Sequence, residues 1–321
     1  MLKSEDFISI IIPMYNSEKT IELVVNEIRT SLENKCKFEI ILVNDYSKDN
    51  VLQVASKLAI DDARIKLIDL AKNSGQVNAM MAGYSLASGT YLVSMDDDFQ
   101  HPAGAIIDLL EELINKDMDV VFAKYQEQKE NAFRRFGSNL NYKMAEIMAG
   151  KPKGIRSNSF FAFRPFIKEN LLKYTNGNPY LFGIIYASTD RISNIEVEHR
   201  SRAEGKSNFT LKKLISLWVN GLLSFSVKPL RMATLFGFMT ACISGLIGFA
   251  MIINRLINPN VGLSGWTSII VCIIFFSGLQ LICVGILGEY LGRLYIAHSK
   301  LPNYCIRKTM NFDEKDKTNN E

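Results

Sequence analysis

The sequence lacks the features that mark secreted, disulfide-bonded or disordered proteins. Its five cysteines are widely spaced and form no C-x-x-C pair, so they indicate a reducing compartment rather than a disulfide framework or a zinc site. Charged residues make up 22% and hydrophobic residues 48%, a balance that excludes disorder. The net charge of +4 over 321 residues is weak evidence for nucleic-acid binding. The apolar run Phe7–Met14 is short and follows Glu5 and Asp6, which indicates a buried strand rather than a signal peptide.

Two common nucleotide-binding motifs are also missing. No G-x-G-x-x-G follows the first predicted strand, and no G-x-x-x-x-G-K-[ST] occurs, so dinucleotide and P-loop sites are not supported. Instead, the first 125 residues alternate strand and helix signals. Short apolar runs such as 38–43 and 91–95 are separated by helical stripes such as the one from Ile21 to Leu32. This alternation predicts an α/β fold with a mostly parallel sheet covered by helices on both faces.

The C-terminal third contains two long stretches without charge. Met232–Asn254 is the first and Leu256–Gly288 is the second, and each exceeds the ~20 residues that cross a bilayer as a helix. Cations flank the pair on both outer sides, whereas the loop between the helices holds only Arg255, so the positive-inside rule places both ends in the cytoplasm. The flanking cations are Lys212, Lys213, Lys228 and Arg231 before the first stretch, and Arg293, Lys300, Arg307 and Lys308 after the second.

These patterns predict four regions. The first is a cytoplasmic catalytic domain at 1–209, followed by an interfacial amphipathic helix at 210–229. Two transmembrane helices follow within 230–295, at about 232–254 and 266–290, and a cytoplasmic tail covers 296–321. The alternatives are an apolar hairpin buried in a soluble core and, for the amphipathic stretch, an ordinary core helix. Small residues every four positions permit close helix packing and assembly into a homo-oligomer; they are Gly237, Ala241 and Gly245.

The candidate site lies where the predicted strands end, because ligands of open α/β sheets bind beyond the carboxyl ends of the strands. Asp96, Asp97 and Asp98 follow the fourth predicted strand directly. Three successive carboxylates repel one another unless a cation or water compensates them. Mg²⁺ and Mn²⁺ suit such a cluster, since they bind one or two carboxylates together with substrate phosphates. The alternative is a solvated acidic loop in which Asp98 caps the following helix.

Six segments occur in an order that resembles one enzyme family. They are Ser9–Asn16, Glu39–Ser47, Asn73–Gln76, Asp96–Pro102, His199–Ser207 and Gly285–Arg293. Together they resemble family-two glycosyltransferases of the polyprenyl-phosphate type, such as dolichol-phosphate mannose synthase and the bacterial undecaprenyl-phosphate glucosyl- and aminoarabinose-type transferases. The resemblance covers nearly the whole chain. It implies a GT-A catalytic domain, Rossmann-like with a mostly parallel sheet, followed by a two-helix transmembrane hairpin in the inner (plasma) membrane.

The implied reaction is a metal-dependent, inverting transfer of one sugar from a nucleotide-sugar to undecaprenyl or another polyprenyl phosphate. A UDP-sugar is the expected donor, and the expected role is cell-envelope glycan synthesis or modification at the cytoplasmic face. The acceptor phosphate is already ionised at pH 7, so no strong general base is required. The enzyme needs instead to neutralise the departing diphosphate and to hold donor and acceptor in line. We therefore expect His101, His199 and His298 to be structural or phosphate-adjacent.

The resemblance also implies roles for individual residues. Those expected to bind the donor nucleotide are Pro13, Tyr15, Asp45, Asp96 and Asp97. Those expected to hold Mg²⁺ or Mn²⁺ are Asp96, Asp98 and Gln100. Those expected to bind phosphate or the acceptor are Lys124, Arg134, Ser138, Arg202 and Ser207. Within these sets, the residues expected to be catalytic are Asp98, Arg134 and Arg202.

The chain departs from the family pattern at several positions. Asn44, Ser17 and Asn208 replace a common Asp, Glu and Lys, and Arg156–Arg164 differs from the usual pattern near the sugar. These departures leave the donor sugar open.

Two other functions were weighed. A processive hyaluronan- or cellulose-type synthase would carry a Gln-x-x-Arg-Trp motif, and Trp218 and Trp266 lie outside any such motif. An inactive membrane scaffold that binds a nucleotide-sugar would not need the intact Asp96, Asp98 and Arg202.

Overall fold

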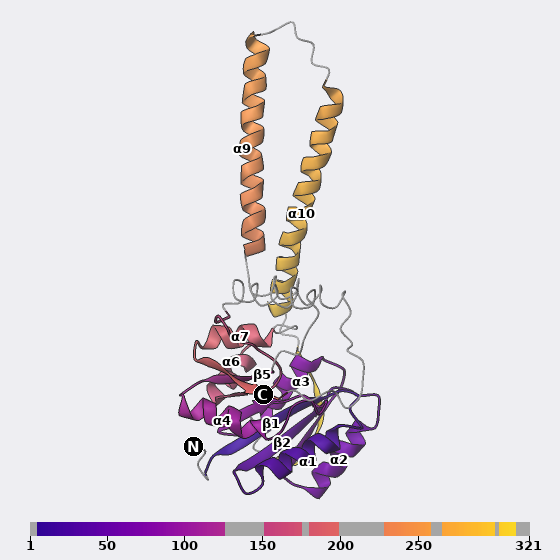
Figure 1. Cartoon of the computed structure of the whole chain (residues 1–321). Coiled ribbons are helices and arrows are strands. Elements are labelled where there is room, and N and C mark those ends of the chain that lie inside the picture. Colours follow the sequence, from indigo (N-terminus) through magenta and orange to yellow (C-terminus); the bar gives the residue numbers. More distant parts are fainter. Residues whose placement is uncertain are drawn as a thin grey trace. The chain divides into compact units, whose positions relative to one another are not determined.

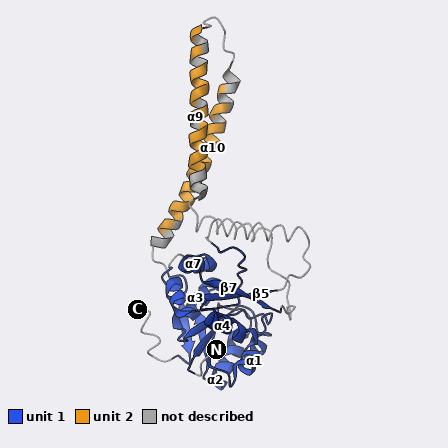
Figure 2. Cartoon of the chain, turned by 60° about the vertical axis from the view of Figure 1, so that its left-hand side comes forward, with its two compact units in different colours: residues 1–211, 300–321 blue, residues 212–299 orange. Residues whose placement is uncertain are grey.

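The computed structural model describes residues 5–125, 151–174, 180–198, 228–257, 265–298 and 302–312. The chain forms two compact units (Figures 1 and 2). The first unit comprises residues 1–211 together with 300–321, and the second comprises residues 212–299. Of the predicted interfacial helix at 210–229, residues 210–227 lie outside the described residues, and 228–229 begin the helix α9 (Lys228–Ile257).

Within the described residues, the first unit is built on an eight-stranded sheet in the order β7-β5-β6-β4-β1-β2-β3-β8. Neighbouring strands run parallel except where β6 and β8 pair with their neighbours, which confirms the predicted mostly parallel sheet. The strands are β1 (Phe7–Met14), β2 (Lys37–Asn44), β3 (Ile65–Leu70), β4 (Tyr91–Ser94), β5 (Val120–Tyr125), β6 (Phe161–Phe163), β7 (Ile192–Val197) and β8 (Ile306–Met310).

Helices connect and cover these strands. The central strand β1 is buried at every position from Ile8 to Met14, so both of its faces are covered, as expected for a parallel strand with helices on each side. α1 supplies part of this cover through residues spaced three and four apart, including Val24, Val25 and Ile28. The helices of this unit are α1 (Ile21–Leu32), α2 (Val51–Asp61), α3 (Gln76–Leu86), α4 (Ala105–Asn115), α6 (Pro165–Leu172) and α7 (Leu181–Ser188).

α3 packs very closely on the centre of the sheet. A Cβ atom at Gly83 would lie 2.4 Å from Ile11 Cγ2 and 3.1 Å from Val43 Cγ2, so only glycine permits this approach. The close packing sets the position of Gln76, the first residue of α3, relative to the ends of β1 and β2.

β8 comes from the far end of the chain. It runs antiparallel to β3, with Leu67 opposite Met310. The Asn311 side-chain amide then donates to the carbonyls of Ala59 (2.5 Å) and Ile65 (2.8 Å). The sequence predicts a cytoplasmic tail at 296–321, so a strand in this region was not expected. β8 covers the edge of β3, which would otherwise expose unpaired backbone groups.

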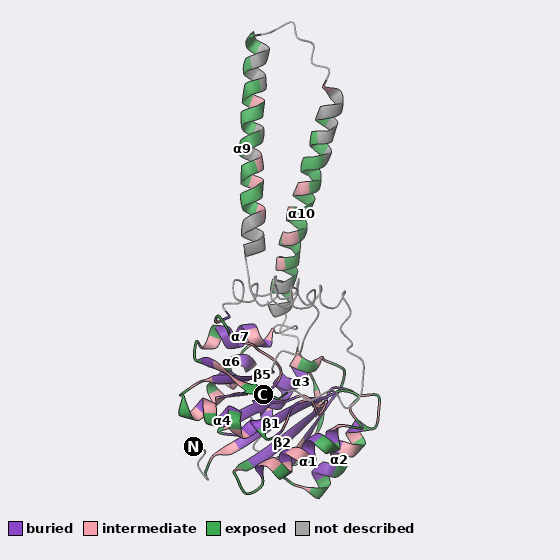
Figure 3. Cartoon of the chain, viewed as in Figure 1, coloured by how far each residue is buried: buried purple, intermediate pink, exposed green. Residues whose placement is uncertain are grey.

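The second unit consists, among the described residues, of two long helices, α9 (Lys228–Ile257) and α10 (Trp266–His298). Both are long and apolar enough to cross a membrane, with candidate spans at Ala233–Ala250 and Phe275–Gly292. Large apolar side chains on them are mostly exposed, for example Phe238 at 67% and Leu281 at 71% (Figure 3). This exposure is expected of helices that face lipid rather than a protein core.

Candidate active site

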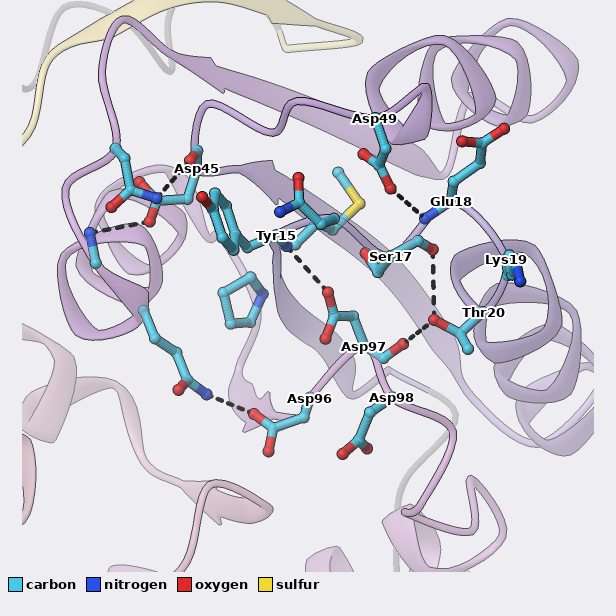
Figure 4. A pocket seen from close by; sticks show the side chains of 16 residues that line it. Tyr15, Ser17, Glu18, Lys19, Thr20, Asp45, Asp49, Asp96, Asp97 and Asp98 are labelled. Carbon is cyan, nitrogen blue, oxygen red and sulfur yellow. Dashed lines mark hydrogen bonds between the residues drawn. The ribbon is translucent and has the colours of Figure 1, made fainter. Parts of the chain in front are cut away.

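A cavity of about 830 Å³ opens at the carboxyl ends of β1, β2 and β4 (Figure 4). Its volume is within the usual range for a small-molecule site. Parallel strands bring their carboxyl ends to one edge of the sheet, so segments far apart in the sequence meet there. Four segments line the cavity. They are Pro13–Thr20 at the end of β1 and after it, Asp45 and Asp49 after β2, Asn73, Gly75 and Gln76 at the approach to α3 and its first residue, and Asp96, Asp97 and Asp98 after β4.

The loops after β1 and β2 are joined by reciprocal hydrogen bonds. The backbone N–H of Asn16 donates to Ser47 Oγ (3.2 Å). In return, the side-chain oxygen Oδ1 of Asn16 accepts a hydrogen bond from the backbone N–H of Lys48 (2.9 Å). Further along, the Glu18 amide N–H donates to Asp49 Oδ2 (2.9 Å). These contacts hold one rim of the cavity in a defined shape before any ligand binds.

Asp45 organises the segment that leads into α3. It is only 3% exposed, and its carboxylate accepts hydrogen bonds from the backbone N–H groups of Ser74 (2.6 Å) and Gly75 (2.9 Å). Gly75 has φ +87°, a conformation that favours glycine. Burial raises the pKa of Asp45, and the two backbone hydrogen bonds oppose that rise.

Asp97 lies between the end of β4 and the loop after β1. Its Oδ2 accepts a hydrogen bond from the Tyr15 N–H (3.1 Å), and its backbone carbonyl accepts one from Thr20 Oγ1 (2.6 Å). Burial raises the pKa of Asp97 to about 6, and the charges of Asp96 and Asp98 act in the same direction. The three carboxylates therefore destabilise one another, and a bound cation would relieve that repulsion.

Asp96 is surrounded by hydrogen-bonding side chains. Gln76 Nε2 donates to Asp96 Oδ1 (2.7 Å), Ser159 Oγ donates to Oδ2, and His101 Nε2 lies 3.3 Å from Oδ2. Burial alone would raise the pKa of Asp96, but the contacts with His101, Ser159 and Gln76 hold it below its ordinary value. His101 is 5% exposed, and its second ring nitrogen hydrogen-bonds the Tyr125 hydroxyl.

Asp98 lines the cavity, and its Oδ1 accepts the Gln100 backbone N–H (3.1 Å). The alternative in which Asp98 caps the following helix is wrong, because the N-cap of α4 is Gly104 and no side chain bonds there. The Gln100 side chain is not part of the cavity lining.

The oxygen donors of Asp96 and Asp98 suit Mg²⁺ or Mn²⁺. Within the described ranges, no three His, Cys, Asp or Glu residues are grouped so as to hold a metal by themselves. An ion here would therefore share its coordination sphere with substrate phosphates and water, which is the usual arrangement for Mg²⁺.

Of the expected phosphate-binding residues, Lys124 lies within the part of the chain that the structure describes. Lys124 lies near the end of β5, where its Nζ pairs with Glu196 Oε1 on β7 (3.0 Å), and it does not line the cavity. Arg134, Ser138, Arg202 and Ser207 lie outside the described residues.

Several lining residues were not predicted. Glu18, Lys19 and Asp49 follow the ends of β1 and β2, so reading the strand ends a few residues further would have found them. Gln76 is part of the Asn73–Gln76 segment that resembles the family, but the resemblance assigned it no role in the site. Ser159, which bonds Asp96 without lining the cavity, was also not predicted as a site residue, because the two are 63 positions apart in the sequence.

The structure also explains one departure from the family pattern. Asn44 Nδ2 donates to Asp69 Oδ1 (2.8 Å), and both side chains are buried. A carboxylate at position 44 would face the buried carboxylate of Asp69, whereas the amide provides it with a donor.

Comparison with known proteins shows clear relatives. Residues 9–172 match the family model described as Glycosyl transferase family 2. The chain is 32% identical to the SfII prophage-derived bactoprenol glucosyl transferase of Shigella flexneri, over 94% of this chain and 98% of that protein. It is 29% identical to the undecaprenyl-phosphate 4-deoxy-4-formamido-L-arabinose transferase of Proteus mirabilis, over 98% of this chain and 97% of that protein.

Among solved structures, the chain is similar in fold to glucosyl-3-phosphoglycerate synthase from Mycobacterium tuberculosis in complex with UDP. The TM-score is 0.51 at 18% identity, covering 68% of this chain and 80% of that chain. This likeness concerns the fold of the catalytic unit, which is of the GT-A-like α/β type.

Proposed function

The chain belongs to glycosyl transferase family 2, and on that premise we propose that it transfers one sugar from a nucleotide-sugar to a polyprenyl phosphate. Undecaprenyl phosphate is the proposed acceptor and a UDP-sugar the proposed donor. The acceptor is supported by the names of relatives that align along at least 94% of this chain, including the segment that forms α9 and α10. That the chain is a glycosyltransferase follows from the family itself.

The cavity at the carboxyl ends of β1, β2 and β4 is the proposed donor site. Its volume of about 830 Å³ accommodates a nucleoside diphosphate with an attached sugar. Pro13, Tyr15 and Asp45 are proposed to bind the base and ribose, since they line the part of the cavity formed by β1 and β2. Asp96 and Asp97 then face the donor from the end of β4.

The proposed cofactor is Mg²⁺ or Mn²⁺, held by Asp98 with Asp96 and by the donor diphosphate. Gln100 would join these ligands only by turning its side chain into the cavity. When bound, the ion supplies positive charge that stabilises the departing diphosphate. The placement of three successive carboxylates at the end of β4 supports this assignment, because their charges repel one another and a cation would offset that repulsion.

In the proposed inverting step, an ionised oxygen of the acceptor phosphate forms a bond to the anomeric carbon. The bond from that carbon to the diphosphate breaks, and its electron pair leaves with the nucleoside diphosphate. Arg134, Arg202, Ser138 and Ser207 are proposed to bind the phosphate groups, and Lys124 would join them only by leaving Glu196.

The connection of the chain supports a proposed membrane arrangement. Residues 1–211 and residues 300–321 belong to the same compact unit, and β8 is a strand of its sheet. If both helices cross the membrane, the chain leaves and re-enters on one side. The cations at both ends of the helix pair favour the cytoplasmic side. We therefore propose that transfer occurs at the cytoplasmic face of the plasma membrane, in the synthesis or modification of an envelope glycan.

The observation that carries this proposal is the aspartate cluster lining a cavity in a chain with two candidate spans. The test is to incubate the purified full chain with undecaprenyl phosphate and a panel of nucleotide-sugars, with Mn²⁺, Mg²⁺ or EDTA, and to identify the lipid product by mass spectrometry. We expect a glycosylated lipid from one donor, formed with a divalent cation and not with EDTA. If no donor yields product under any condition, the proposal is wrong.

A further inference from the structure

Both oxygens of the Asp96 carboxylate are engaged by side chains from separate segments. Gln76 Nε2, at the start of α3, donates to Oδ1 (2.7 Å). Ser159 Oγ, in the segment just before β6, donates to Oδ2. Because the donors approach different oxygens, rotation of the carboxylate about its Cβ–Cγ bond would break at least one of these hydrogen bonds.

The segment that carries Ser159 is itself held firmly on the sheet. Asn158 Nδ2 donates to the Ala123 carbonyl on β5 (2.5 Å), and the Phe160 N–H donates to Asn158 Oδ1 (2.9 Å). Phe160 is fully buried. Ser159 is thus fixed from both sides in the sequence.

His101 lies behind the same carboxylate oxygen. Its ring packs against Phe160, with ring centres 5.0 Å apart, and stacks on Tyr125 at 5.8 Å. The contact of His101 with Asp96 Oδ2 (3.3 Å) therefore comes from a ring that packing holds in place.

Ser159 does not line the cavity, whereas Asp96 does. A change at Ser159 therefore removes no direct contact with a ligand and acts through Asp96. Residues that orient groups at a metal or diphosphate site in this way commonly affect affinity or rate by 10- to 100-fold.

We propose that Ser159 and Gln76 are positioning residues for sugar transfer: they hold the Asp96 carboxylate in one orientation, so that the diphosphate and its cation meet a preformed site. This inference rests on the proposed function and concerns the same cavity. The proposal gives a role to Ser159, which lies in the Arg156–Arg164 segment that departs from the family pattern.

The test compares Ser159→Ala with Ser159→Thr and with the matched control Ser157→Ala. Ser157 lies two positions away, carries the same hydroxyl and bonds Tyr186 instead of Asp96. Two readouts are needed on the purified full chain: the affinity for UDP with and without Mn²⁺, measured by calorimetry, and kcat and KM for the donor.

For Ser159→Ala we expect Mn²⁺-dependent UDP affinity to fall about 10- to 100-fold, with a matching loss in kcat/KM. Ser159→Thr keeps the hydroxyl and is expected to recover most of the UDP affinity and most of kcat/KM. For Ser157→Ala, both quantities are expected to remain within about twofold of the wild type. Gln76→Glu, which sets a carboxylate against Asp96 Oδ1, is expected to lose at least as much as Ser159→Ala. Melting temperatures show whether each variant is folded.

The outcomes separate this inference from the proposed function. If the wild type turns over but Ser159→Ala behaves like Ser157→Ala in both readouts, the positioning role is wrong and the proposed function stands. If no donor is turned over but UDP binding falls selectively in Ser159→Ala, the proposed function is wrong and the positioning role stands. If the wild type shows neither turnover nor Mn²⁺-dependent UDP binding, both are wrong.

Discussion

The two ends of the catalytic sheet use charged residues in opposite ways. At the amino ends, the buried Glu39 carboxylate lies 2.8 Å from Lys66 Nζ and accepts a hydrogen bond from Ser9 Oγ (2.5 Å). At the carboxyl ends, Asp96 and Asp97 lie beside each other, and their described contacts come from polar side chains and backbone N–H groups. Opposite charges are therefore paired at the amino ends, and like charges are collected at the carboxyl ends of the strands that form the cavity. The pair of Lys124 and Glu196, at the carboxyl ends of β5 and β7, lies outside the cavity lining.

Opposite charges are also paired at the amino-end edge of the sheet near β5, β6 and β7, which lie across the sheet from β2 and β3. Arg164, which follows β6, lies 3.0 Å from Asp117 and 3.6 Å from Asp119, just before β5. Arg191, just before β7, lies 2.5 Å from Asp117. These ion pairs stabilise the fold and lie away from the cavity. The carboxylates that line the cavity repel one another, which lowers the stability of the fold but favours the binding of a cation.

The largest expected effect is at the amino ends. Glu39→Ala leaves the largely buried ammonium group of Lys66 without its carboxylate, and breaking a buried pair in this way lowers the free energy of unfolding by about 3–5 kcal/mol. Denaturant unfolding of the purified protein measures it. The double variant Glu39→Ala with Lys66→Met is expected to recover part of the loss. If Glu39→Ala abolished turnover while leaving stability unchanged, the assignment of this end to folding would be wrong.

The next effect is at the carboxyl ends. Asp98→Asn is expected to reduce kcat/KM about 100-fold or more, because it removes a charged oxygen ligand from the proposed cation site. Its melting temperature should not fall, since one of three mutually repelling carboxylates is lost. The control is Asp108→Asn, an exposed carboxylate in the first turn of α4. If Asp98→Asn turned over the donor within twofold of the wild type, the proposed role of Asp98 as a cation ligand would be wrong.

The pH dependence of stability sharpens the comparison further. The pKa of Asp97 is about 6 in the folded chain, against about 3.9 for an unfolded aspartate. Between these values the folded state binds more protons, so stability falls as pH rises from about 4 to about 6 and is then level. We expect the titration of Asp97 to change the free energy of unfolding by about 1–3 kcal/mol over this pH range, and we expect no such change in Asp97→Asn. The unfolding is measured in EDTA so that no divalent cation is bound. Equal pH slopes in wild type and variant would contradict it.

The smallest expected effect concerns backbone strain near the cavity. Tyr46 and Phe99, in the loops after β2 and β4, have φ values of +57° and +62°, which bulky residues rarely adopt. Tyr46→Gly is expected to be more stable than Tyr46→Ala by about 1 kcal/mol, because alanine keeps the strain that glycine relieves. Thermal unfolding of the two variants measures the difference, and an alanine variant as stable as the glycine variant would show that the loop carries no such strain.

Much of the cavity could be predicted because the relevant residues follow strands that the sequence reveals. Pro13, Tyr15, Asp45 and the three aspartates after β4 all follow apolar runs, and strand ends of a parallel sheet converge. The family resemblance implied a phosphate-binding role for Lys124, yet its charge is paired with Glu196 on the neighbouring strand β7. No local pattern indicates which strand lies next to β5, so its partner could not be predicted.

Local sequence patterns are enough to predict the α/β class, the mostly parallel sheet, the two long apolar helices and the acidic end of β4. Each of these follows from hydrophobic periodicity or run length, which depend on neighbouring residues only. The tertiary structure alone decided that β8 joins β3, that Asn44 faces Asp69, and that Gln76 and Ser159 meet at Asp96. These contacts join residues 20 or more positions apart, and they form only when strand order and the packing of helices on the sheet bring distant side chains together.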